Sequence, residues 1–180
     1  GAISPAVFIP IAEEIGIISQ IGKFVLEQAT KACATWPANV SVAVNVSSLQ
    51  FQQSDVCAVV SHALSKSGLD PHRLEIEITQ AVLTDESETT LQTLHQLHDL
   101  GVKFSMDDFG TGYSSLSYLR SFPFDKIKID QSFVRDLSQH ENSTAIIRAV
   151  TLLAKSLDMM TTVEGVETEE QLARIKALGC

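Results

Sequence analysis

Residues 74–107 read LEIEITQAVLTDESETTLQTLHQLHDLGVKFSMD, and they contain a β-rich run, a helical pattern and a second β-rich run. In the runs Leu74–Thr79 and Val102–Asp107, apolar and polar side chains alternate, as is typical of a strand with two different faces. Between them, the helical pattern Asp85–Leu100 ends at Gly101, the residue type that takes a left-handed helix cap. This order predicts two parallel strands joined by a helical crossover.

The succession of strand and helix continues on both sides of this unit. The further β-rich runs are Val40–Val46, Lys126–Asp130 and Met160–Glu164. The further helical patterns are Ile11–Lys31 starting after Pro10, Asp55–Ser67 before Gly68, Asn142–Leu157, and a last helix that begins at the capping box Thr168-Glu-Glu-Gln171. Alternating strands and helices predict an α/β fold built on a parallel sheet.

Alternation also sorts the five predicted strands into an aliphatic face and a polar face. We expect the aliphatic face to pack against the helices, and its residues are Val42, Val44, Val46, Ile76, Ile78, Phe104, Met106, Ile127, Ile129, Thr161 and Val163. The polar face continues to the C-terminal end of every strand. An open doubly wound sheet needs functional residues at only two or three strand ends, whereas a closed barrel gathers all of them on one rim. The pattern therefore favours a (β/α)8 barrel of the TIM type.

Such a barrel typically needs about 250 residues. We therefore expect residues 1–180 to be a single barrel domain that lacks strands at both ends.

Composition limits the possible functions. The net charge of −9 argues against binding a nucleic-acid polymer, which requires a basic face. Because no run of 18 apolar residues is present, we expect no membrane contact by this segment. The cysteines, Cys33, Cys57 and Cys180, lack metal-ligand spacing and cannot all pair, which favours a reducing, cytoplasmic location.

Acidic side chains accumulate at the predicted strand ends. The charges of Glu77, Asp107, Asp108 and Glu164 sum to −4, which two divalent cations would balance, and Lys128 is the single strand-end lysine that offsets them. The candidate ligands are oxygens, the Asn45 amide included, and no histidine lies at a strand end. This donor set favours Mg²⁺ or Mn²⁺ over Zn²⁺.

Two roles are open for Lys128. Beside bound cations its pKa would fall, and it could act as a general base on a metal-bridging water. Alternatively, it forms a salt bridge with Asp130 or Asp107.

The segment Asp107–Ser115, DDFGTGYSS, leaves a strand through a glycine-containing loop. Its adjacent acids could cap the next helix, but two acids beside such a loop favour metal binding.

These motifs together resemble the EAL-domain cyclic di-GMP phosphodiesterases. The resemblance runs from Phe8-Ile-Pro-Ile-Ala-Glu-Glu14 to Glu164-Gly-Val-Glu167 and includes Asn45-Val-Ser47, Glu77-Ile-Thr79, the Asp107–Ser115 loop and Lys128-Ile-Asp-Gln-Ser-Phe133. It implies metal ligation by Asn45, Glu77, Asp107, Asp108 and Glu164, with Lys128 assisting the nucleophilic water and Glu167 supporting the site. It also implies cleavage of cyclic di-GMP to linear pGpG, in a homodimer joined near the Asp107–Ser115 loop.

Two features depart from the family pattern. The Glu-Ala-Leu motif, which supplies a further metal ligand, is expected upstream of Gly1. Gln80 stands where the family usually has a Glu that holds the Asp107–Ser115 loop in position. Both departures leave a rival hypothesis open: a degenerate domain that binds cyclic di-GMP as a receptor without hydrolysing it.

Overall fold

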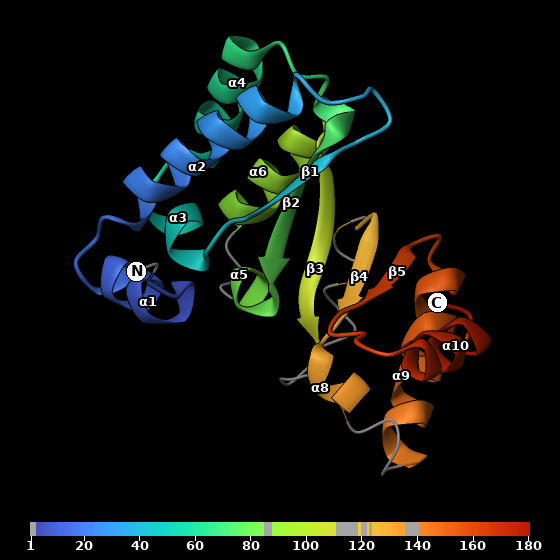
Figure 1. Ribbon diagram of the computed structural model, residues 1–180. Coiled ribbons are helices and arrows are strands. Elements are labelled where there is room, and N and C mark those ends of the chain that lie inside the picture. The colour runs from blue at the N-terminus through green and yellow to red at the C-terminus, as the bar shows by residue number, and fades with distance from the viewer. Residues whose placement is uncertain (1–2, 85–87, 111–118, 120–121, 123, 136–140) are drawn as a thin grey trace. The chain divides into compact units, whose positions relative to one another are not determined.

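The structure is a computed structural model that describes residues 3–84, 88–110, 119, 122, 124–135 and 141–180. The chain forms two compact units, Gly1–Lys103 and Phe104–Cys180. Each unit is an α/β arrangement with parallel strand pairing (Figure 1). Within the described ranges, no helix is long and apolar enough to cross a membrane.

The first unit contains two complete strands and most of the helices that the structure describes. Its elements are α1 (Pro5–Glu14), α2 (Ile18–Cys33), β1 (Val42–Asn45), α3 (Ser48–Gln53), α4 (Val56–Ser67), the 3-10 helix η1 (Pro71–Arg73), β2 (Leu74–Thr79), α5 (Gln80–Thr84) and α6 (Glu88–Asp99). Strands β1 and β2 pair in parallel, with Val42 opposite Leu74 and Asn45 opposite Glu77. Helices α2 and α4 lie side by side (Figure 1). The predicted aliphatic face is buried here at Val44, Ile76 and Ile78.

The prediction of one helix over Ile11–Lys31 is wrong. Two helices, α1 and α2, occupy this stretch, and Pro10 lies inside α1 rather than before its start. The break falls at Gly16, whose φ of +76° is a left-handed conformation that ends a helix. Pro5 occupies the first turn of α1, where the absence of an N–H has no consequence.

The other predicted helix ends are confirmed where they are described. Asp55 caps the start of α4, where its carboxylate accepts a hydrogen bond from the Ala58 N–H at 2.9 Å, and Gly68 with φ +68° caps its end. In helix α10, the predicted capping box is present: the Thr168 hydroxyl accepts from the Gln171 N–H, and the Gln171 side chain accepts from the Thr168 N–H.

The second unit contains the remaining strands. Its elements are β3 (Lys103–Phe109), β4 (Lys126–Ile129), α8 (Gln131–Arg135), α9 (Glu141–Ser156), β5 (Met160–Val163) and α10 (Glu169–Ala177). Strand β4 pairs in parallel with both β3 and β5. Its core contains Phe104, Phe122 and Phe124, which pack edge to face with centroid distances of 5.1 and 4.9 Å. All five predicted strands are thus confirmed, with ends shifted by at most two residues.

Three short helices that periodicity did not predict directly follow strand ends. They are α3 after β1, α5 after β2 and α8 after β4. Local side-chain hydrogen bonds start two of them: the Gln50 side chain accepts from the Ser47 N–H at 3.1 Å, and Asp130 accepts from the Ser132 N–H at 2.9 Å. The chain therefore turns sharply at the end of each of these strands.

Candidate functional site

In the first unit, two predicted metal ligands are brought together. Asn45 is the last residue of β1, and the strand register places it opposite Glu77 of β2. Pairing continues one residue further, because the Val46 N–H donates to the Glu77 carbonyl at 3.0 Å. The Glu77 side chain is buried and Asn45 is exposed. The amide oxygen of Asn45 and the carboxylate of Glu77 therefore lie near the C-terminal ends of two neighbouring parallel strands.

In the second unit, β3 contains one residue more than β4 at the site. Met106 is opposite Ile127, and Phe109 is opposite Ile129. Two acidic residues, Asp107 and Asp108, thus lie against the single residue Lys128. This is the arrangement of a β-bulge, in which two residues of one strand oppose one residue of the next.

The bulge changes which way the following side chains point. In a regular strand, adjacent acids would lie on opposite faces of the sheet. Asp108 instead has φ +53°, a left-handed conformation that aspartate tolerates better than most residues. Strict alternation would also put Phe109 on the polar face with Asp107, yet the register places Phe109 opposite Ile129 of the aliphatic face. The extra residue therefore keeps a pair of acids at the strand end and returns the chain to the core.

Lys128 links the ends of this strand layer through two ion pairs. Its Nζ lies 3.0 Å from Asp107 Oδ1 and 2.8 Å from Glu164 Oε1. The Lys128 side chain is only 11% exposed. Glu164 follows β5, and its N–H donates to the Ile129 carbonyl at 3.1 Å. The salt bridge expected as one role of Lys128 is therefore present with Asp107, and Glu164 is a second partner.

The net charge of this cluster is negative despite the lysine. The pKa of Asp108 is raised, first by partial burial of its carboxylate and then by the negative charges of Asp107, Asp130 and Glu164, while Lys128 opposes the change. Asp130 is a contributor that we did not place in the site from sequence. Its position directly after Ile129 of the alternating run KIKID could have indicated it. Its own pKa is lowered by hydrogen bonds from Ser132.

Glu167 lies apart from these ion pairs. It is exposed on the segment before α10, where its backbone N–H donates to the Gln171 side chain at 2.8 Å. Among the described residues, its carboxylate makes no ion pair with Lys128. Gln80 is the first residue of α5, directly after β2. Residues 111–115 of the Asp107–Ser115 loop, and with them the expected dimer contact, lie outside the described residues.

The residues of the second unit fit a divalent metal by their chemistry. Asp107, Asp108 and Glu164 supply hard oxygen donors, and four carboxylates face one ammonium group. Over the described ranges, no three His, Cys, Asp or Glu side chains are already arranged around a common cation position. Lys128 is instead paired with one carboxylate oxygen of Asp107 and one of Glu164.

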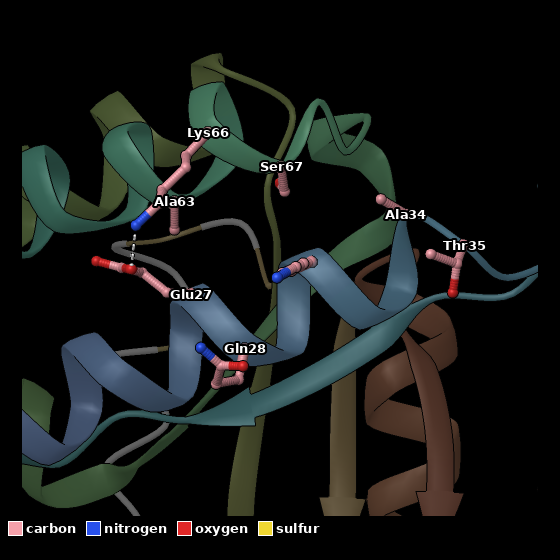
Figure 2. Close-up of a pocket in the computed structure, with 8 residues that line it drawn as sticks. Glu27, Gln28, Ala34, Thr35, Ala63, Lys66 and Ser67 are labelled. Atoms are coloured by element: carbon pink, nitrogen blue, oxygen red, sulfur yellow. Dashed lines mark hydrogen bonds and ion pairs between the residues drawn. The ribbon is translucent and has the colours of Figure 1, made fainter.

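A separate pocket in the first unit contains none of the predicted site residues. It has a volume of about 530 Å³, lies between α2 and α4, and is lined by Glu27, Gln28, Lys31, Ala34, Thr35, Ala63, Lys66 and Ser67. Figure 2 shows Lys66 of α4 pointing toward Glu27 of α2, to which it is paired at 2.6 Å. This ion pair joins two helices and lowers the pKa of Glu27.

Comparison with known proteins identifies the class of domain. The family model described as "EAL domain" matches residues 1–180, and the chain belongs to this family. Its fold is accordingly the parallel α/β barrel type of EAL domains. A solved structure described as "PaMucR Phosphodiesterase, c-di-GMP complex" has a TM-score of 0.95 and 39% identity, with 100% of this chain and 74% of that chain covered. The FimX EAL domain from Pseudomonas aeruginosa, bound to c-di-GMP, has a TM-score of 0.89 and 25% identity, with 99% of this chain and 72% of that chain covered.

Curated relatives agree with this assignment. The chain is 39% identical over 184 residues to the bifunctional diguanylate cyclase/cyclic di-GMP phosphodiesterase MucR of Pseudomonas aeruginosa, with 100% of this chain and 27% of MucR covered. It is 36% identical over 174 residues to the cyclic di-GMP phosphodiesterase PdeR of Escherichia coli, with 95% of this chain and 26% of PdeR covered. The chain thus spans about a quarter of the length of these relatives.

Proposed function

We propose that this chain is the catalytic part of a metal-dependent phosphodiesterase that hydrolyses cyclic di-GMP to linear pGpG. The observation that carries the proposal is the Asp107–Lys128–Glu164 cluster at the strand ends of an EAL domain. Relatives at 36–39% identity are named as cyclic di-GMP phosphodiesterases. The chemistry adds one water across one of the two phosphodiester bonds of the cyclic substrate and opens the ring.

The proposed roles follow the donor types. Asn45, Glu77, Asp107, Asp108 and Glu164 would hold Mg²⁺ or Mn²⁺, with two ions expected. Bound divalent cations supply a Lewis acid for the phosphate oxygens and lower the pKa of a coordinated water. Lys128 would assist the nucleophilic water, and Glu167 would support the site from the segment after Glu164.

The test is the substitution Asp107→Asn in the full-length protein that carries this chain. The amide preserves the shape of the side chain but removes a ligand charge and the Lys128 ion pair. The rate of Mn²⁺-dependent hydrolysis of cyclic di-GMP is measured by chromatography of the product pGpG. We expect this rate to fall by about a hundredfold or more, because a misplaced nucleophile alone costs that much. The far-UV circular dichroism should be unchanged.

A matched control is Asp70→Asn. Asp70 is an exposed acid of the first unit that is paired with His72 at 2.9 Å, and it is not a site residue. This variant should retain wild-type turnover. Unchanged turnover of Asp107→Asn at saturating metal would overturn the metal assignment.

Gln80 favours one alternative, a receptor that binds cyclic di-GMP without hydrolysis. It begins α5 immediately after the strand that carries Glu77, where the family usually has an acid. Calorimetry with cyclic di-GMP distinguishes the two functions. Binding with turnover supports the phosphodiesterase, whereas binding without turnover at any Mg²⁺ or Mn²⁺ concentration identifies the receptor.

We also infer a homodimer that forms near the Asp107–Ser115 loop, and a cytoplasmic location. The free cysteines Cys33, Cys57 and Cys180 support a reducing compartment. Light scattering coupled to size-exclusion chromatography tests the dimer, and a monomeric mass at micromolar concentration would refute it.

A further inference from the structure

The ammonium group of Lys128 is bound by two of the carboxylates that we propose as metal ligands. It lies 3.0 Å from Asp107 Oδ1 and 2.8 Å from Glu164 Oε1, and the shorter distance is that of a charge-assisted hydrogen bond. The three residues come from β3, β4 and the segment after β5. A single cation thus already joins the ends of three strands in the second unit.

This arrangement places Lys128 in competition with a divalent cation. A carboxylate oxygen that accepts from an ammonium group has less capacity left for a metal, and two cations a few ångströms apart repel each other. The repulsion is weakly screened at the Asp107 pair, because the Lys128 side chain is 11% exposed and the Asp107 side chain 13% exposed, and more strongly screened at Glu164, which is 39% exposed. A divalent cation that binds these same oxygens of Asp107 and Glu164 therefore competes with Lys128.

The lysine does not neutralise the cluster. Asp107 and Asp108 lie opposite this single lysine in the strand register, and Glu164 is its second ion-pair partner, so three carboxylates share one ammonium group. A net negative field therefore remains to attract a cation. The bulge in β3 is the cause, since it sets two acids against one lysine.

We propose that Lys128 is an internal counter-cation that lowers the affinity of this acidic cluster for divalent metal and is released from Asp107 and Glu164 when the metal binds. The inference rests on the proposed function, because it concerns the same carboxylates. It gives Lys128 two successive roles. The side chain is held in ion pairs when the carboxylates have no other cation, and it becomes available to the substrate phosphate and water once a divalent cation has taken over the carboxylates.

The test is calorimetric titration of the metal-free full-length protein with Mn²⁺, in the absence of substrate. Lys128→Met removes the charge and retains the length of an unbranched side chain, whereas Lys128→Arg retains the charge. We expect Lys128→Met to bind Mn²⁺ about tenfold more tightly than wild type, and Lys128→Arg to remain within about threefold of it. Hydrolysis by Lys128→Met should fall, so affinity and activity move in opposite directions.

Lys66→Met is the matched control for loss of a paired lysine. Lys66 also forms a short ion pair, with Glu27 at 2.6 Å, but it is exposed and belongs to the first unit (Figure 2). Its substitution should leave the Mn²⁺ affinity unchanged. A tighter affinity in this variant as well would indicate a general effect of net charge and would overturn the proposal.

Lys128→Met leaves two carboxylates without their ammonium partner, and this loss could prevent folding. A second variant and measurement test the proposal in that case. Lys128→Gln retains a hydrogen-bond donor without the charge, and its thermal unfolding is recorded with and without Mn²⁺. Because a ligand stabilises the folded state according to its affinity, this variant should melt below wild type without metal and gain more from Mn²⁺ than wild type does.

The outcomes separate the two hypotheses. Failure of the wild-type protein to bind Mn²⁺ at millimolar concentration would overturn the proposed function together with this inference. If wild type binds Mn²⁺ and the neutral Lys128 variants bind it equally or more weakly, Lys128 positions the ligands instead of competing with the metal. The inference is then wrong, and the proposed function stands.

Discussion

Gly165 follows the proposed ligand Glu164 directly, and replacing it with alanine should distort the site by steric overlap. Its φ is +71°, a left-handed conformation that costs a residue with a Cβ atom about 1 kcal/mol. A Cβ at this position would lie 2.5 Å from Cβ of Gln131, the first residue of α8. That neighbour is attached directly to the backbone and cannot rotate away.

The two effects add to an estimate for Gly165→Ala. Overpacking of this kind costs typically 1–3 kcal/mol. Together with the backbone strain, we expect a loss of about 3 kcal/mol in the free energy of unfolding, or roughly 6–12 °C in the melting temperature. Because the displaced segment carries Glu164, which we propose as a metal ligand, we also expect weaker Mn²⁺ binding.

Gly68→Ala provides the control. Gly68 has a similar φ of +68°, but a Cβ there would meet nothing within 4 Å. This variant should lose only about 1 kcal/mol, and it should retain the wild-type Mn²⁺ affinity. The assays are urea denaturation followed by circular dichroism and calorimetric titration with Mn²⁺. Equal stability of the two variants would show that the close approach to Gln131 does not constrain the Glu164 segment.

Three other substitutions test separate parts of the structure. Gln80→Glu should raise turnover of cyclic di-GMP in the full-length protein, because a carboxylate accepts stronger hydrogen bonds than an amide, and an unchanged rate would show that Gln80 is sufficient. Arg73→Met should lower the free energy of unfolding by about 2–4 kcal/mol, because the guanidinium donates hydrogen bonds to the carbonyls of Cys33 and Val40, each at 2.8 Å. A loss below about 1 kcal/mol in a denaturant titration would contradict this. Asp108→Asn should raise the melting temperature in the presence of a chelator, because it removes one of several mutually repelling carboxylates. The same variant should be stabilised less by Mn²⁺ than wild type is. A melting temperature below that of wild type in the chelator would contradict the charge argument.

Much of the fold follows from local patterns along the chain. Alternation identified five strands because each has one aliphatic face, and Ile76, Ile127 and Ile129 are fully buried as that pattern requires. The parallel pairing followed from helices between the strands. The acidic strand ends, with Lys128 among them, were also visible, since parallel strands bring their C-terminal ends to one edge.

Other features depend on contacts between residues distant in sequence. The division of Ile11–Lys31 into two helices is an exception, because the signals that set it are local: Pro5 starts α1, so Pro10 lies inside the helix, and Gly16 with φ +76° ends it. The extra residue in β3 is invisible to a pattern of alternating faces, because a bulge is defined by pairing with the next strand. That pairing brings Asp107 and Asp108 against Lys128. Lys128 pairs with Asp107 and Glu164 among its possible acidic partners. Strand register decides this choice, and register is a property of the assembled sheet that no segment of the sequence contains by itself.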